Sequence, residues 1–298
     1  MNTSICFAVA LSTSVLFMGC KKESDDNTTP AAAEPKLIFK YKFDSTQTRL
    51  NSTGGVAVVP PNHGAQSPVF NGMSSHYIEL TPTAYTALGS GTILYRADET
   101  VVGGSNAIDF SKSSFKGNNE VFFSKPLKDI ATGTYNYIRV SLAYQNYDIK
   151  FRYNLGGTNY DLDGTVASFI GYNTYINNVK IKNQTLTVNG NRLQGFWAFE
   201  IPSASVVDSG QAPAGATTVP NPLFSTSAVP AGSCVVTGTF ASPLTITGNE
   251  TQDIVITISL STNKSFEWEE LSSPGYFEPA LGDRVVDMGI RGLTPIVN

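Results

Sequence analysis

The feature that most constrains this chain is a period-two alternation of apolar and polar residues, repeated in short segments along most of its length. In the segments 37–43 and 254–260 every second residue is large and apolar. Such alternation indicates a strand with one buried face, and no segment sustains the 3.6-residue period of an amphipathic helix. We therefore expect an all-β fold, an antiparallel β-sandwich, built either as one unit or as two modules.

Composition suggests how the body is divided. Residues 202–222 consist mostly of Pro, Gly, Ala, Ser and Thr and predict a linker or a long crossing loop. A β-sandwich domain at 36–201 would precede it. Residues 223–298 would follow, either as a second β module or as strands that complete the first sheet. Residues 44–74, which include Pro60-Pro61 and several Gly and Asn, predict a long irregular loop.

The front of the chain carries an apolar run, residues 5–18, that ends in Gly19-Cys20. A run of about 14 residues is too short for a membrane-spanning helix and suits the core of a signal peptide, here residues 1–19. Residues 16–20 resemble the cleavage box of bacterial lipoproteins. That resemblance implies a mature protein that begins at Cys20, carries palmitate or similar acyl chains there, and is anchored to a membrane. Residues 20–35 are charged and then rich in Pro and Ala, which predicts a disordered tether.

Several phrases extend this resemblance. The charged segment 21–26 is similar to the one that follows the acylated cysteine in Bacteroidota-type surface lipoproteins. The turn phrases at 131–135 and 230–234, and the ending at 244–266, resemble uncharacterised β-sandwich lipoproteins of that type, some distantly like a copper-associated periplasmic family (MbnP-like). The resemblance implies an outer-membrane, lipid-anchored protein that faces the cell surface, and it assigns no catalytic residues.

The net charge bears on which ligands are expected, and the cysteines bear on whether the body carries a reactive thiol. The net charge is −4, and no basic cluster follows Lys21-Lys22, so nothing favours a nucleic acid as the ligand. Cys234 would be the one cysteine left in the folded body, where we expect a buried, small apolar residue rather than a reactive thiol.

The segment 134–155 predicts a hairpin that turns at Gln145-Asn146. Its apolar residues would face the core. Its outward face would present aromatic rings beside positive charge, at Tyr135, Tyr137, Arg139, Lys150 and Arg152. Such a face suits recognition of a glycan or a protein, and the simpler alternative is a set of solvated outward residues.

Two metal sites are open alternatives. Asn159, Asp161 and Asp163 match the first half of a calcium loop, although Ile170 stands where the bidentate carboxylate is needed, so a polar turn is the alternative. His63, Met73 and His76 could bind copper as soft ligands. Each histidine could instead be a hydrogen-bonded loop or strand residue.

The familiar catalytic motifs are absent from the sequence, which contains only two histidines. We therefore expect a membrane-anchored binding or structural module rather than an enzyme. The alternative is a glycan hydrolase that uses two converging carboxylates, a pair that sequence alone cannot reveal.

Overall fold

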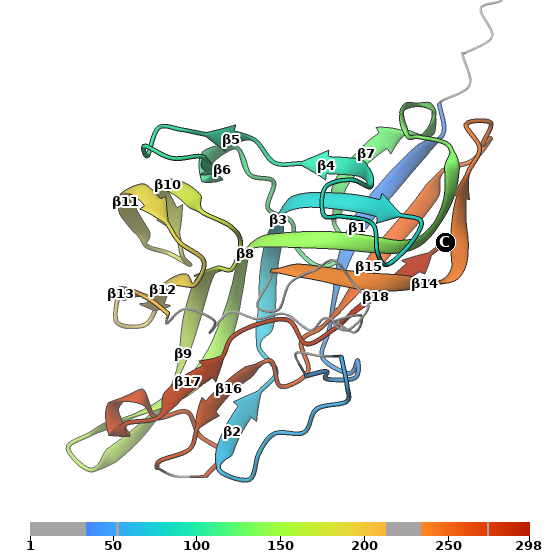
Figure 1. The fold of residues 1–298 in the computed structure, drawn as a ribbon. Coiled ribbons are helices and arrows are strands. Elements are labelled where there is room, and N and C mark those ends of the chain that lie inside the picture. Colours follow the sequence, from blue (N-terminus) through green and yellow to red (C-terminus); the bar gives the residue numbers. More distant parts are fainter. Residues whose placement is uncertain (1–33, 52–53, 213–233, 273) are drawn as a thin grey trace, which may run out of the picture. The chain divides into compact units, whose positions relative to one another are not determined.

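The computed structural model describes residues 34–51, 54–212, 234–272 and 274–298. The predicted signal peptide, the acylated Cys20 and most of the tether lie outside the described residues, as does the second half of the predicted linker. The described chain is almost entirely β-structure, and its only helices are three short 3₁₀ turns, Phe110–Lys112, Leu127–Asp129 and Pro279–Leu281 (Figure 1). None of its helices is long and apolar enough to cross a membrane. The all-β prediction is confirmed.

One long strand, β8 (Gly133–Leu155), organises the largest sheet. Along the sheet the order is β13-β12-β9-β8-β3-β4, and β14 also pairs with β8. The bounds of these strands are β3 Val69–Thr81, β4 Thr92–Arg96, β9 Thr158–Phe169, β12 Phe196–Ile201, β13 Val206–Gln211 and β14 Val235–Ile246. The first part of β8 pairs with β14 and the second part with β9, so the neighbouring strand changes along the length of β8.

The predicted hairpin within 134–155 is therefore wrong. Gln145 and Asn146 do not turn; they are buried in the middle of β8, where their amide groups donate to the carbonyl oxygens of Met288 and Ile181. The turn lies at Gly156-Gly157, between β8 and β9, and both glycines have positive φ, 60° and 85°. A two-residue hairpin turn needs that backbone conformation, which glycine adopts without strain.

A second sheet covers one face of the first. Its order is β18-β15-β1-β7, with bounds β1 Lys36–Asp44, β7 Val121–Pro126, β15 Ile254–Ser261 and β18 Leu293–Val297. Apolar residues of β1 and β15 pack with those of β3, β8 and β14 in the main core, which gives the sandwich-like arrangement. Burial of a large apolar side chain contributes roughly 1.5–3 kcal/mol, so this core is the main source of stability. β1 and β15 run parallel, an exception to the antiparallel prediction.

A four-stranded sheet, ordered β11-β10-β6-β5, lies beside the second part of β8. Its strands are β5 Glu99–Thr100, β6 Ala107–Asp109, β10 Thr174–Lys180 and β11 Thr185–Arg192. Apolar residues of β10 pack with those of β8, β9 and β12 in a separate, smaller core.

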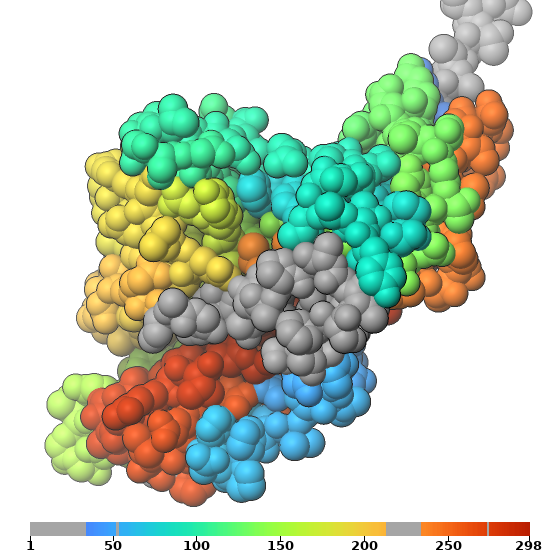
Figure 2. Space-filling model, viewed as in Figure 1, coloured from blue at the N-terminus to red at the C-terminus, as the bar shows by residue number. Residues whose placement is uncertain are grey.

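A three-stranded sheet, ordered β17-β16-β2, combines one strand from the N-terminal part of the chain with two strands from its C-terminal part. Its strands are β2 His63–Gln66, β16 Phe266–Glu269 and β17 Arg284–Asp287. In Figure 2 the blue atoms of β2 adjoin the red atoms of the C-terminal strands, in agreement with the pairing of β2 and β16. Phe266 and Trp268 pack with Phe151 and Phe277 in a third core. The long loop predicted at 44–74 is thus interrupted by β2 and by the start of β3.

The predicted linker also begins too early. Residues 206–211 form β13, which pairs along its whole length with β12. Small and polar residues suggested a loop, but a strand whose side chains are mostly exposed tolerates them because only its backbone must pair. After the segment 213–233, β14 and β15 pair with β8 and β1, so the C-terminal strands share sheets with the N-terminal ones.

Candidate functional site

Two residues of the predicted recognition face are buried. Tyr135 donates its hydroxyl to the Ala131 carbonyl at 2.7 Å. Arg139 is fully buried, forms an ion pair with Glu79, and donates to the carbonyl oxygens of Ala84 and Thr86. Tyr137 is half-buried. These contacts hold the sheet together and leave Tyr135 and Arg139 unable to face a ligand.

Lys150 and Arg152 lie at the other end of β8. Lys150 lies eleven positions after Arg139 on one continuous strand, and that distance is roughly 36 Å of chain at about 3.3 Å per residue. The five residues predicted to form one patch are therefore not brought together. The error has a single cause, because folding 134–155 into a hairpin would have placed its two halves side by side.

The predicted calcium residues face Lys150 and Arg152 across the strands. Asp163 accepts from Lys150 at 2.7 Å, Asp161 accepts from Arg152 at 2.6 Å, and Asn159 accepts from Asn154 at 2.7 Å. We call these six residues the β8–β9 ladder. They lie on extended strands and not in a loop that could wrap an ion. The hydrogen bond from Arg152 lowers the pKa of Asp161, and the one to Asp163 raises the pKa of Lys150.

The predicted copper ligands are also separated. His63 belongs to β2 and lies 2.5 Å from Glu267, whereas His76 belongs to β3 and lies 2.7 Å from Glu99. Met73 is fully buried in the main core. Across the ranges that the structure describes, no three His, Cys, Asp or Glu side chains form a group suited to a metal ion. The geometry thus assembles neither predicted ligand set.

Cys234 lies directly before β14. Its thiol is 3.8 Å from the Ser141 hydroxyl, and burial raises its pKa above the ordinary value. A thiol that resists ionisation is a poor nucleophile, which agrees with the structural role expected for it.

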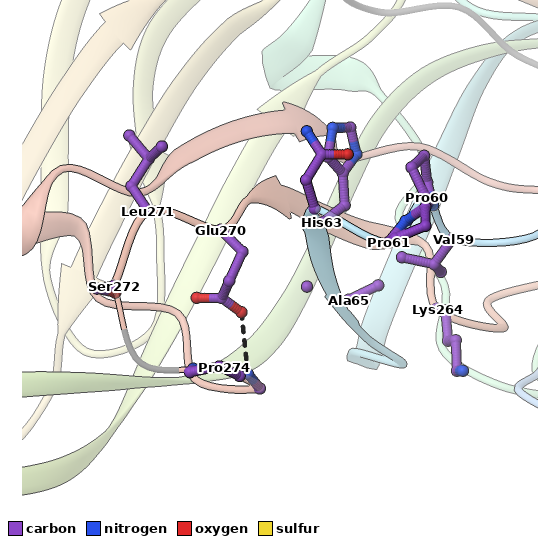
Figure 3. A pocket seen from close by; sticks show the side chains of 13 residues that line it. Val59, Pro60, Pro61, His63, Ala65, Lys264, Glu270, Leu271, Ser272 and Pro274 are labelled. Atoms are coloured by element: carbon purple, nitrogen blue, oxygen red, sulfur yellow. Dashed lines mark hydrogen bonds between the residues drawn. The ribbon is translucent and has the colours of Figure 1, made fainter.

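A pocket opens where β2 and the end of β16 meet, with a volume of about 560 Å³. Its lining comes from two parts of the chain about 200 residues apart in the sequence, which are residues 59–65 and residues 264, 270–272, 274 and 275. Its apolar lining side chains are Val59, Pro60, Pro61, Ala65, Leu271 and Pro274, and its polar ones are Asn62, His63, Lys264, Glu270 and Ser272 (Figure 3). We call this the His63–Glu270 pocket. Its volume lies within the range of small-molecule sites in proteins.

A buried cluster of charged side chains fixes the side chain of His63. Glu267 accepts from Nδ1 of His63 and also from Arg49, and Arg291 lies within 3.5 Å of the same carboxylate. Arg291 is paired with Asp287 as well. Burial, together with the nearby charge of Arg49, lowers the pKa of Arg291 to about 10. Because a carboxylate can only accept, Nδ1 of His63 carries its proton, and the ring orientation is fixed.

Glu270 follows β16 and enters the pocket. Its backbone N–H donates to the Asn62 carbonyl at 2.9 Å, which extends the pairing of β16 with the chain before β2. One carboxylate oxygen, Oε2, accepts from the Gly275 N–H at 2.9 Å. The other, Oε1, is buried and has no hydrogen-bond partner among the described residues. An unsatisfied buried acceptor of this kind costs on the order of 1–3 kcal/mol.

Lys264 lines the pocket on the side opposite Glu270, with His63 between them (Figure 3). Its backbone φ is 48°, in the left-handed region that side chains other than Gly and Asn rarely adopt. Two contacts hold that conformation: its N–H donates to the Ser67 hydroxyl, and its carbonyl accepts from Nε of Arg49. The same arginine therefore supports both Lys264 and, through Glu267, His63.

Close contacts fix the two walls of the pocket. A Cβ at Gly64 would lie 2.3 Å from the indole of Trp268, so only glycine fits there against the fully buried ring. On the other side, Asp283 accepts from the Leu271 N–H and from the Ser272 hydroxyl and braces the wall. Ser272 is thus engaged in a structural contact.

Sequence reasoning found His63 but missed Glu270 and Lys264. Neither belongs to a motif, and Glu270 is one of 24 acidic residues. No protein-family model, no curated protein and no solved structure matches this chain. The likeness to β-sandwich lipoproteins stays a prediction.

Proposed function

We propose that this chain is an exported lipoprotein, acylated at Cys20, whose β-sandwich body binds a small ligand in the His63–Glu270 pocket without transforming it. The observation that carries the binding role is the carboxylate of Glu270, which lines the pocket, forms no ion pair with a described residue and has one oxygen, Oε1, that accepts no hydrogen bond from the described residues. A cationic group of a ligand would supply the partner that this carboxylate lacks among the described residues.

The site is also pre-organised. The imidazole of His63 is fixed by Glu267, and the pocket wall is braced by Asp283. Fixed side chains reduce the entropy that binding would otherwise cost. Among the described residues that line the pocket, Glu270 is the one carboxylate, so the pocket favours a binding module over a two-carboxylate hydrolase.

Filling the pocket tests the binding role. Ala65→Trp places an indole in the space that a ligand would occupy, whereas Ala241→Trp adds the same ring to an exposed strand position. In a thermal-shift screen of amino acids, dipeptides and disaccharides, we expect compounds that stabilise the wild type and the Ala241 variant to have no effect on the Ala65 variant. If every stabilising compound acts equally on all three proteins, the pocket is not the binding site.

The anchor is tested separately. Cells that express the full chain should incorporate a labelled fatty acid into the protein, and Cys20→Ser should abolish that label. With the lipid in place the protein should fractionate with the outer membrane and be digested by protease added to intact cells. An unlabelled wild-type protein would refute the lipoprotein assignment.

A further inference from the structure

We infer that the His63–Glu270 pocket takes a zwitterionic ligand about the size of a dipeptide, with its ammonium group at Glu270 and its carboxylate toward Lys264. This inference rests on the proposed binding function and names the chemical class of the ligand. Its support comes from the arrangement of acceptors and charge within the pocket.

The polar group at one side of the pocket, the carboxylate of Glu270, can only accept hydrogen bonds. Oε1 of Glu270 is a buried carboxylate oxygen without a partner in the described part of the chain. Such a group calls for a ligand group with several donors and a positive charge. An ammonium group has three N–H donors and full charge complementarity.

The charge of Glu270 is also not compensated internally. It forms no ion pair with any residue that the structure describes, whereas Glu267, three residues earlier on β16, contacts Arg49, His63 and Arg291. A partly buried carboxylate without a cationic partner is a natural counter-ion site for a cationic ligand group.

The opposite side of the pocket carries the opposite charge. Lys264 is exposed and takes part in no ion pair within the described residues. Its positive φ of 48° is unfavourable for a residue with a Cβ, and a glycine or asparagine would adopt it more readily. We infer that a lysine occupies this position because its ammonium group pairs with the carboxylate of the ligand.

The lining disfavours a sugar as the ligand. Glycan sites commonly stack a sugar ring on an exposed aromatic face, but the described lining contains no Phe, Tyr or Trp side chain. Trp268 lies beneath Gly64 and is fully buried. Small apolar side chains such as those of Pro60 and Leu271 suit the aliphatic side chains of a short peptide instead.

Calorimetric titration with L-alanyl-L-alanine as the probe tests this inference. The wild-type protein should bind one dipeptide, and the N-acetylated, C-amidated dipeptide should bind at least tenfold more weakly. Glu270→Gln keeps the shape of the side chain and removes its charge, so affinity should fall about 10- to 100-fold, the value of a charge-assisted hydrogen bond. Glu269→Gln, the neighbour on the other face of the strand, should bind like the wild type.

Lys264→Asn removes the second charge while keeping a residue that accepts positive φ, and we expect a smaller loss, about three- to tenfold, because Lys264 is exposed. The ligand-side comparison does not depend on any variant folding. Equal affinity for the free and the blocked dipeptide, or no dipeptide binding, overturns the inference. If a neutral disaccharide then binds the wild type but not the Ala65→Trp variant, the binding module stands and only the ligand class is wrong.

Discussion

The β8–β9 ladder and the His63–Glu270 pocket use similar side chains in opposite ways. In the ladder, Lys150 and Arg152 each meet an aspartate directly across the strands. In the pocket, Glu270 and Lys264 lie on opposite sides and neither forms an ion pair with a described residue. A charge that is already paired within the protein gains little from contact with a charged ligand. A row of Tyr, Arg and Lys in the sequence is therefore weaker evidence for a binding site than one carboxylate in a pocket that forms no ion pair with a described residue.

The two regions also differ in what lies beneath the surface. The ladder charges are mostly solvent-exposed, whereas the pocket rests on a buried cluster in which Arg49 and Glu267 are each only 7 % exposed. Solvent screens the ladder and leaves the cluster unscreened. The four predictions that follow test this contrast.

The largest effect is expected for Glu267→Gln. Removing this carboxylate leaves Arg49 and Arg291 buried without their shared partner, and the loss of one member of a buried ion pair typically costs about 3–5 kcal/mol. Urea denaturation should show a fall of that size in the free energy of unfolding. Asp163→Asn in the ladder serves as the control and should change stability too little to resolve. A similar, small effect for both variants would remove the contrast.

A smaller effect is expected from adding one methyl group at matched glycines. A Cβ at Gly64 would lie 2.3 Å from the Trp268 ring, and a Cβ at Gly164 would lie 2.3 Å from the Phe199 ring. Overpacking of this kind costs roughly 1–3 kcal/mol, so both alanine variants should unfold at lower urea concentration. Only Gly64→Ala should also weaken binding of the dipeptide. Equal binding by both variants would show that the β2 backbone does not shape the site.

Glu270→Gln should change stability in the other direction. Because Oε1 is buried and unsatisfied, neutralising the side chain should leave the free energy of unfolding unchanged or raise it by up to about 1 kcal/mol in the absence of ligand. Glu269→Gln is the control and should stay within about 0.5 kcal/mol of the wild type. A clear loss of stability in the Glu270 variant would mean that this carboxylate has a structural partner after all.

The smallest effect concerns pH and the ladder. The hydrogen bond from Arg152 lowers the pKa of Asp161 in the folded protein, so this pair favours the folded state above the ordinary aspartate pKa. That contribution is lost as the pH falls through the lowered, folded-state value. Asp161→Asn should therefore show a slightly shallower fall of melting temperature between about pH 5 and pH 2. An identical acid profile would show that the pair does not couple to folding.

The sequence predicted the strands better than their partners. The alternation at 37–43 and 254–260 corresponds to β1 and β15, but nothing local predicts that these strands pair in parallel across the length of the chain. The false hairpin arose because Gln145 and Asn146 look like a polar turn; in the structure the NH₂ groups of both side chains donate to distant carbonyl oxygens within the core. Gly156-Gly157 was the stronger turn signal.

The site was less predictable than the fold. Pro60-Pro61 and His63 could be singled out because proline and histidine are informative at short range, whereas Glu270 matters only because hydrogen bonds to Asn62 and Gly275 place it in the pocket lining. Burial of one carboxylate oxygen is a property of the assembled β2 and β16 strands. No spacing in the sequence encodes it.

The most direct test of the contrast is a titration of isotope-labelled protein with L-alanyl-L-alanine, followed through the backbone amide resonances. The account predicts saturable shifts confined to the pocket residues that have a backbone N–H, which are Val59, Asn62, His63, Gly64, Ala65, Lys264, Glu270, Leu271, Ser272 and Gly275, with the amides of the β8–β9 ladder unmoved. Shifts in the ladder, or no shifts at all, would contradict it.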